Sequence, residues 1–162
     1  MHMRTLDLDA IISDITAQYE TYGKEGSEPI KKAYEYARKC HEWVQRKSGE
    51  PYINHPVSAA KELIAIQPDL TTIIATLIHD TVSDGSGDLV EIQKLFWPHV
   101  ARIVEALDKI GMVKYRWNQS TIDRLQRTLI AMAQDVRSIF VKFADRIDNL
   151  RTLQYHENLE KS

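Results

Sequence analysis

The sequence predicts an all-α domain of seven or eight helices packed around one core. Apolar residues recur with a helical period in nearly every segment, and glycine, proline or polar stretches separate these segments. The chain contains no β-hairpin signal, internal repeat or low-complexity tract. Its 162 residues suit a single domain, 1–162, with a full hydrophobic core.

The expected helices are, in order, 6–20, 27–46, 55–66, 69–84, 88–97, 99–111, 120–134 and 135–153. Ser27, with Pro29 two residues later, is typical of a helix start. The glycine and proline of 47–51 should break the second helix, and Gly85 should end the fourth. The polar stretch 114–120 is the one long loop expected.

Composition and charge exclude several function classes. The net charge of −2 gives no indication of nucleic-acid or anionic-membrane binding, so any anion site must be local. The longest apolar stretch, 73–78, is too short to cross a bilayer. The single cysteine, Cys40, cannot form an internal disulfide, which is compatible with the reducing cytoplasm that we expect as the location.

The helix expected at 69–84 carries chemistry on one side. Ile74, Ile78 and Val82 are spaced by four and predict a buried stripe. At roughly 100° per residue, four polar residues share an arc of about 140° on the other side: His79, Asp80, Ser83 and Asp84. Taken alone, this pattern also fits a solvated polar face.

Two further features supply similar groups. In 135–153, five residues form a broad apolar face: Ile139, Phe140, Phe143, Ile147 and Leu150. Asp145, Asn149 and Thr152 share the opposite side at i, i+4 and i+7. His55 precedes Pro56 at a loop-to-helix corner that can aim an imidazole. Each feature alone also fits an ordinary surface residue.

Together, His55, His79, Asp80 and Asp145 make a mixed nitrogen and oxygen ligand set. Such a set suits Mn²⁺, Fe²⁺, Zn²⁺ or Co²⁺, whereas an all-oxygen set would indicate Mg²⁺ or Ca²⁺. A site with four protein ligands leaves coordination positions for water and substrate. The sequence therefore predicts a divalent transition-metal site.

The order His, His-Asp, Asp on separate helices resembles the HD phosphohydrolase superfamily. Three blocks are similar to RelA/SpoT-type alarmone hydrolases: 46–56 (RKSGEPYINHP), 75–80 (ATLIHD) and 143–153 (FADRIDNLRTL). The resemblance spans about residues 30–155. It implies an HD-domain helical bundle that hydrolyses (p)ppGpp at its 3′ position to GDP or GTP and pyrophosphate, with Mn²⁺ as the usual metal.

By matched position, the resemblance assigns the residue roles. His55, His79, Asp80 and Asp145 are implied metal ligands. The substrate-binding set is Arg46, Lys47, Ser48, Asn149 and Thr152. A guanidinium can stack on a purine, which agrees with Arg46. A cationic helix C-terminus remains the alternative explanation of the Arg46-Lys47 pair.

The chain departs from the family pattern on the metal helix. The family has His-Asp-x-x-Glu-Asp, whereas Ser83 here replaces the glutamate that orients and deprotonates the attacking water. Serine is a poor base at neutral pH, which leaves Asp84 as the catalytic base and Ser83 as a water-holding group. Two smaller departures are Asp148 in place of a histidine, and Asp108 in place of the threonine of a Thr-Lys pair.

Other functions stay open at this stage. A catalytically silent alarmone-sensing module fits the loss of the glutamate at Ser83. An HD phosphohydrolase for another nucleotide and a ligand-free helical scaffold are further alternatives. The chain is either a stand-alone enzyme or part of a longer protein, in which case a C-terminal synthetase domain is the expected partner.

Overall fold

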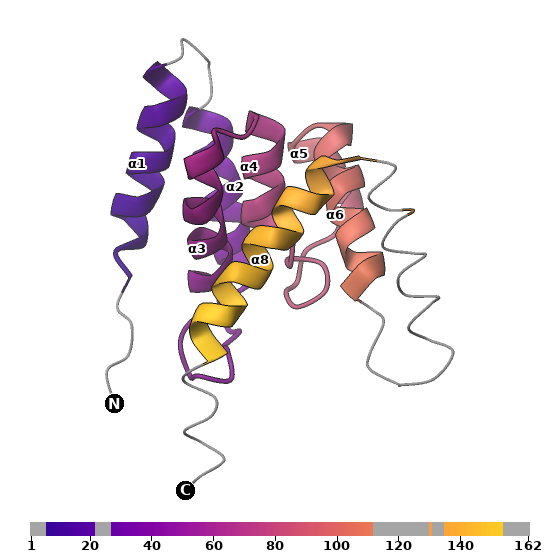
Figure 1. Cartoon of the computed structure of the whole chain (residues 1–162). Helices are drawn as coiled ribbons and strands as arrows, with labels where there is room; N and C mark the ends of the chain where they lie inside the picture. The colour runs from indigo at the N-terminus through magenta and orange to yellow at the C-terminus, as the bar shows by residue number, and fades with distance from the viewer. Residues whose placement is uncertain (1–5, 22–26, 112–129, 131–134, 154–162) are drawn as a thin grey trace, which may run out of the picture.

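Helix α4 (Leu70–Ile78) lies at the centre of the fold and contacts helices on several sides. The computed structural model describes residues 6–21, 27–111, 130 and 135–153 (Figure 1). The α-helices around α4 are α1 (Leu8–Thr21), α2 (Ser27–Cys40), α3 (Asn54–Leu63), α5 (Leu89–Leu95), α6 (Pro98–Gly111) and α8 (Arg137–Leu153), and a short 3₁₀ helix spans Ile64–Ile66. Within the described ranges, the only β contact is an isolated bridge between Gln45 and Pro51. The predicted all-α fold class is therefore confirmed.

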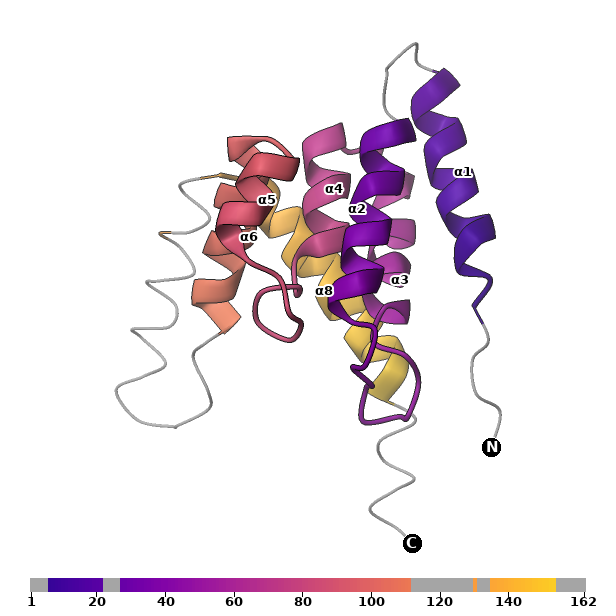
Figure 2. The same cartoon turned by 180° about the vertical axis from the view of Figure 1, so that it is seen from behind.

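The helices lie in layers on either side of α3 and α4. Helix α8 crosses the front diagonally and packs on α3, α4 and α6. Seen from behind in Figure 2, α2 covers the opposite side of α4, and α1 packs against α2 and α3. This arrangement buries α4 on every side, with Ile73, Ile74, Leu77 and Ile78 fully inaccessible. Across the described part of the chain, no helix is both long and apolar enough to span a membrane.

Helices α2 and α4 each end about six residues earlier than the sequence predicts. Helix α2 stops at Cys40 rather than at 46, because its last carbonyl accepts a hydrogen bond from Ser86 N at 3.1 Å. Helix α4 stops at Ile78 rather than at 84. Thr81 Oγ1 donates to the Ile78 carbonyl at 2.8 Å, and Gly87 N donates to the Thr81 carbonyl, so the chain turns away. The helix expected at 120–134 and the loop expected at 114–120 lie outside the described residues, Ile130 excepted.

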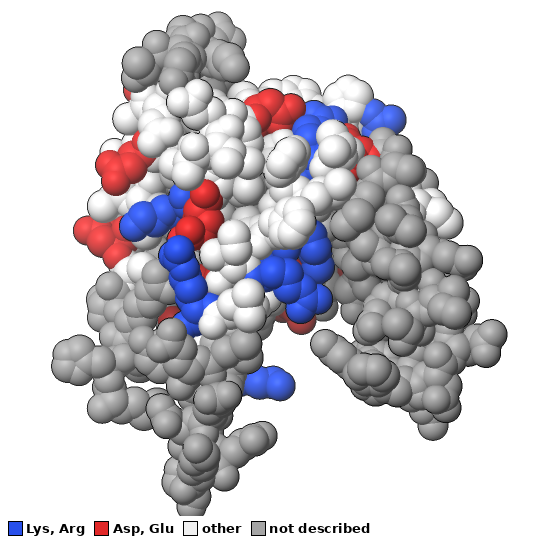
Figure 3. Space-filling model, viewed as in Figure 1, with Lys and Arg blue, Asp and Glu red and all other residues white. Residues whose placement is uncertain are grey.

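The orientation of α8 corrects the burial that its sequence suggests. The buried residues of its polar side are Asp145, Asp148 and Thr152. Exposed apolar residues follow the other side at a spacing of three and four: Val136, Phe140, Phe143, Ile147 and Leu150. Figure 3 shows this side as a band without charge that runs along α8, with lysine and arginine gathered beside it. The apolar pattern of α8 thus marks its solvent side.

Candidate metal centre

A cleft of about 580 Å³ opens beside α8, at the turn that follows α4. Its walls come from the α2–α3 loop, α3, the turn after α4, α6 and α8. The lining residues are Arg46, Tyr52, His55, His79, Asp80, Val82, Ser83, Asp84, Leu107, Asp108, Lys142, Asp145, Arg146 and Asn149. This cleft gathers polar groups from chain segments that are far apart in sequence.

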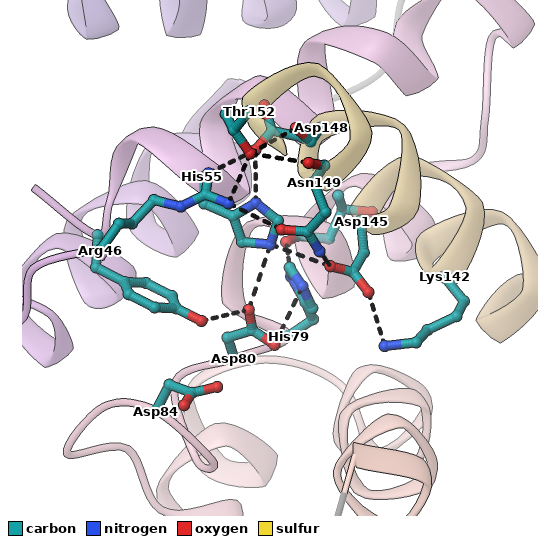
Figure 4. Close-up of polar contacts among 12 residues, drawn as sticks. Arg46, His55, His79, Asp80, Asp84, Lys142, Asp145, Asp148, Asn149 and Thr152 are labelled. Carbon is teal, nitrogen blue, oxygen red and sulfur yellow. Dashed lines mark hydrogen bonds and ion pairs between the residues drawn. The ribbon is translucent and has the colours of Figure 1, made fainter. Parts of the chain in front are cut away.

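The four predicted ligands converge at the floor of this cleft (Figure 4). His55 Nε2 lies 3.4 Å from Asp80 Oδ2 and 3.3 Å from Asp145 Oδ1. His79 Nε2 lies 3.1 Å from Asp80 Oδ1. His55, His79 and Asp80 each offer a ligand atom within 4.8 Å of the others. The structure thus brings together all four residues, while their role as ligands stays a prediction.

The donor atoms of both histidines suit a cation. His79 Nδ1 hydrogen-bonds the Thr76 carbonyl at 2.8 Å, so this nitrogen carries the hydrogen and Nε2 offers a lone pair. His79 Nε2 is buried and lies 3.1 Å from Asp80 Oδ1, but it makes no hydrogen bond among the described residues. His55 Nδ1 likewise faces Asp148 Oδ2 at 2.7 Å, which turns its Nε2 toward the other ligands. Imidazole and carboxylate donors together fit a divalent transition metal.

The charged groups of the site stabilise one another. Burial opposes the charge on His55, but hydrogen bonds to Asp145, Asp148 and Asp80 raise its pKa to about 10. Burial also opposes the charge on Asp80, yet His79 and His55 hold the pKa of Asp80 well below its ordinary value. The pKa of Asp145 is lowered too, because its contacts with His55, His79 and Lys142 outweigh its burial. The carboxylates therefore stay ionised and attract positive charge.

Asp145 is held in place by its neighbours on α8. Lys142 Nζ, one turn earlier, lies 2.7 Å from Asp145 Oδ2. Asn149, one turn later, donates its amide hydrogen to Asp145 Oδ1 at 2.6 Å. Side chains three and four residues apart meet on a helix surface, so α8 itself provides this support.

The predicted substrate residues occupy different places. Arg46 and Asn149 line the cleft, and Arg46 Nη2 donates to Asn149 Oδ1 at 2.8 Å. Thr152 lies behind them, where its hydroxyl accepts from Arg46 Nη2 at 3.3 Å. Lys47 is exposed, and neither Lys47 nor Ser48 belongs to the cleft lining. The structure groups Arg46 and Asn149 with the ligands and leaves Lys47 and Ser48 outside the cleft.

Ser83 and Asp84 lie at the open side of the cleft. Both are exposed, and Ser83 Oγ donates to Asp84 Oδ2 at 3.2 Å. They belong to the turn after α4 and not to the helix itself, which corrects the predicted helix length. The two side chains still share one side of the cleft with Asp80.

Three residues that contact the predicted ligands have no role predicted from the sequence. Tyr52 donates its hydroxyl hydrogen to Asp80 Oδ2 at 3.0 Å, and no periodic signal marks a loop residue of this kind. Lys142 contacts Asp145, and Asp148 contacts His55. The spacing of three residues on either side of Asp145 could have indicated both.

Comparison with known proteins places the chain in a family. Residues 33–162 match the HD domain family. This chain belongs to the HD domain family. Its HD domain is 42% identical over 127 residues to the guanosine-3′,5′-bis(diphosphate) 3′-pyrophosphohydrolase of Aquifex aeolicus (strain VF5), which covers 78% of this chain. It is 38% identical over 125 residues, 76% of the chain, to the bifunctional (p)ppGpp synthase/hydrolase SpoT of Escherichia coli (strain K12).

A solved structure shows the same similarity. The HD domain resembles a chain of a metazoan ortholog of SpoT that hydrolyzes ppGpp and plays a role in starvation responses, with a TM-score of 0.60 and 29% sequence identity. The match covers 76% of this chain and 69% of the other. By contrast, the HD domain spans only 18% of the length of each of the two curated relatives named above.

Proposed function

We propose that this chain is a metal-dependent guanosine-3′,5′-bis(diphosphate) 3′-pyrophosphohydrolase that cleaves (p)ppGpp to GDP or GTP and pyrophosphate. The main support is the convergence of His55, His79, Asp80 and Asp145 in one cleft that also holds Arg46. Relatives that are named for this activity share 35–42% of the aligned residues. Mn²⁺ is the proposed metal because it is the usual metal of the alarmone hydrolases that the sequence resembles, and it is one of the divalent cations that suit a set of two imidazoles and two carboxylates.

The cleft supplies positive charge for a phosphate-rich substrate. Arg46, Lys142 and Arg146 all line it. The outer N–H groups of Arg46 already bond Asp148 and Asn149, so the planar face of its guanidinium is what it can offer a purine. Lys142 and Arg146 lie on the α8 side, where they can bind phosphate oxygens.

The proposed reaction adds the oxygen of water to the phosphorus that bears the 3′ oxygen. The bond from this phosphorus to the 3′ oxygen breaks, pyrophosphate leaves, and the 3′ oxygen takes up a proton. A bound divalent cation would lower the pKa of water and screen the phosphate charge. Asp84 accepts the proton of the attacking water, and Ser83, hydrogen-bonded to Asp84, holds that water in place.

One observation favours a second function. Ser83 places a hydroxyl where the family carries a carboxylate, and its side chain is exposed. A hydroxyl is a poor proton acceptor, so a module that binds the alarmone without cleaving it is the alternative.

The deciding experiment incubates the purified chain with ppGpp and Mn²⁺ and follows GDP and pyrophosphate, with ppGpp binding measured in parallel. Asp84→Ala should lower the rate by ~10²–10⁴-fold, and Ser83→Glu should raise it. Asp14→Ala, on the exposed side of α1, is the matched control. Binding without product would establish the silent module, and neither binding nor product would refute both functions.

A further inference from the structure

Asp148 is a buried carboxylate beside the metal centre that the proposed reaction does not use. It follows Asp145 by three residues on α8 and is only 2% exposed. An ionised carboxylate at such a place is costly unless it is paired. The partners that stabilise this buried carboxylate therefore indicate its role.

One oxygen of Asp148 serves two partners. Asp148 Oδ2 lies 2.7 Å from His55 Nδ1, on α3, and 2.7 Å from Arg46 Nη1, in the α2–α3 loop (Figure 4). Because a carboxylate only accepts, both nitrogens donate to it. Asp148 thus connects a predicted metal ligand with the residue proposed to contact the purine.

The contact with His55 determines which ring nitrogen is free. When Nδ1 donates to Asp148, Nε2 is the nitrogen available to a cation, and it already lies 3.3–3.4 Å from Asp145 and Asp80. A carboxylate behind a ligating histidine also makes the imidazole a stronger donor, and loss of such a partner typically costs 10–100-fold in metal affinity.

The contact with Arg46 completes a closed ring of polar contacts. Arg46 donates to Asn149 Oδ1, Asn149 donates to Asp145 Oδ1, and Asp145 faces His55 Nε2. The ring returns through His55 Nδ1 to Asp148. Displacement of one member should therefore disturb both the predicted metal ligands His55 and Asp145 and the proposed nucleotide contact Arg46.

We propose that Asp148 is a positioning residue that orients His55 toward the metal and Arg46 toward the nucleotide. This inference rests on the proposed metal-dependent function, whose site it refines. A histidine, which the resembling family carries at this position, offers no carboxylate to share between an imidazole and a guanidinium. The carboxylate of Asp148 therefore distinguishes this chain from the family pattern that it resembles.

The test uses metal binding, which does not depend on hydrolysis. Asp148→Asn keeps the shape of the side chain and removes its charge, so Mn²⁺ affinity measured by calorimetry should fall by about 10–100-fold. In the Zn²⁺-loaded protein, the NMR resonance of the His55 Nδ1 hydrogen should move upfield in Asp148→Asn, because its acceptor is no longer charged. GDP affinity without metal should fall as well, because Arg46 loses its anchor.

Two variants make the test specific. Asp135→Asn removes a carboxylate that also binds an arginine, Arg137 at 2.6 Å, but lies outside the cleft lining, and it should leave Mn²⁺ affinity unchanged. Asp148→Glu keeps the charge and should restore the His55 resonance toward its original position. This rescue would not follow if Asp148 only filled space.

The outcomes separate this inference from the proposed function. Unchanged Mn²⁺ affinity and an unchanged His55 resonance in Asp148→Asn would overturn the role of Asp148, even with hydrolysis intact. Mn²⁺ binding that depends on Asp148 in a protein that leaves ppGpp intact would support the role of Asp148 and refute the hydrolase. If Asp148→Asn did not fold, a folded Asp148→Glu that keeps the charge but binds Mn²⁺ about 10–100-fold more weakly, with its His55 resonance moved upfield, would overturn the proposal.

Discussion

Helix α8 has two faces whose burial is the reverse of what their polarity suggests. Asp145, Asp148 and Thr152 are buried against the rest of the domain, whereas Phe143 and Leu150 on the opposite side are each 63% exposed. Burying a carboxylate is expensive unless it is paired. Here Asp145 contacts Lys142 and His55, and Asp148 contacts Arg46 and His55, as Figure 4 shows.

This contrast indicates that the site sets the orientation of α8. A buried ion pair is weak evidence for stability, because desolvation offsets much of the attraction. The apolar residues that α8 does bury are small, namely Val141 and Ala144. The large apolar residues would contribute more to the core, yet the helix presents its carboxylates to His55 and Arg46 instead. We therefore expect the polar face to serve binding more than folding, and substitutions on the two faces should have different effects.

The largest expected effect is on metal binding by the polar face. Asp145→Asn removes one carboxylate of the predicted ligand set, and Mn²⁺ affinity should fall by at least about 100-fold, the upper end of the loss seen for residues that only support a ligand. Calorimetry measures this affinity. Asp14→Asn should bind Mn²⁺ like the unmodified chain, and equal affinities in all three proteins would contradict the assignment of Asp145.

Metal removal should change stability through the same face. At a Mn²⁺ concentration 100 times its dissociation constant, binding should stabilise the folded state by about 2.7 kcal/mol, and chelation should abolish this gain. Denaturant unfolding with and without chelator measures the difference. The gain should persist in Phe143→Ser and disappear in Asp145→Asn; a gain of equal size in both variants would show that the metal binds elsewhere.

A smaller effect is expected where α8 begins. Asp69 caps α4 through Thr72 N at 2.7 Å and pairs with Arg137 Nη1 at 3.0 Å. Asp69→Ala should lower the free energy of unfolding by about 1 kcal/mol, the usual cost of losing a cap. The variant should keep the Mn²⁺ affinity of the unmodified chain, because Asp69 lies outside the cleft lining.

The contribution of Asp69 to the free energy of unfolding should also depend on pH. Burial opposes its charge, but the bonds from Thr72 and Arg137 lower the pKa of its carboxyl. Since the folded state holds the proton less tightly, the stabilisation is present above the ordinary pKa of about 3.9 and is lost as the pH falls through the lower, folded value. The stability difference between Asp69→Ala and the unmodified chain should therefore shrink in acid, and a constant difference would contradict this assignment.

The smallest expected effect belongs to the exposed apolar face. Phe143→Ser should change the free energy of unfolding by no more than about 0.5 kcal/mol, because the side chain is mostly in solvent. Val141→Ser, on the buried side of the same helix, should be clearly less stable, since it leaves a cavity and buries a hydroxyl. Denaturant unfolding midpoints compare the two, and equal losses would mean that α8 is oriented differently in solution.

The helical fold class and the residues that carry chemistry could be predicted from the sequence alone. Helical periodicity is a local property, so α1, α3, α5, α6 and α8 begin within two residues of their predicted starts. The candidate ligands His55, His79, Asp80 and Asp145 could likewise be identified in the sequence. Buried imidazoles and carboxylates need specific polar partners, and a divalent cation is one that suits both. Their roles as ligands stay predictions that the convergence of the four side chains supports.

The buried side of α8 and the end of α2 depend instead on tertiary contacts. Periodicity shows which residues share a face, but the partner that covers the face lies far away in the chain: Arg46 and Asp148 are 102 residues apart. The end of α2 depends on Ser86, whose hydrogen bond to the Cys40 carbonyl forms only after the chain has folded back, whereas α4 ends in a local turn between Thr81 and Gly87. The ring from Asp148 through Arg46, Asn149, Asp145 and His55 arises in the same way, because long-range contacts bring together groups that no local pattern relates.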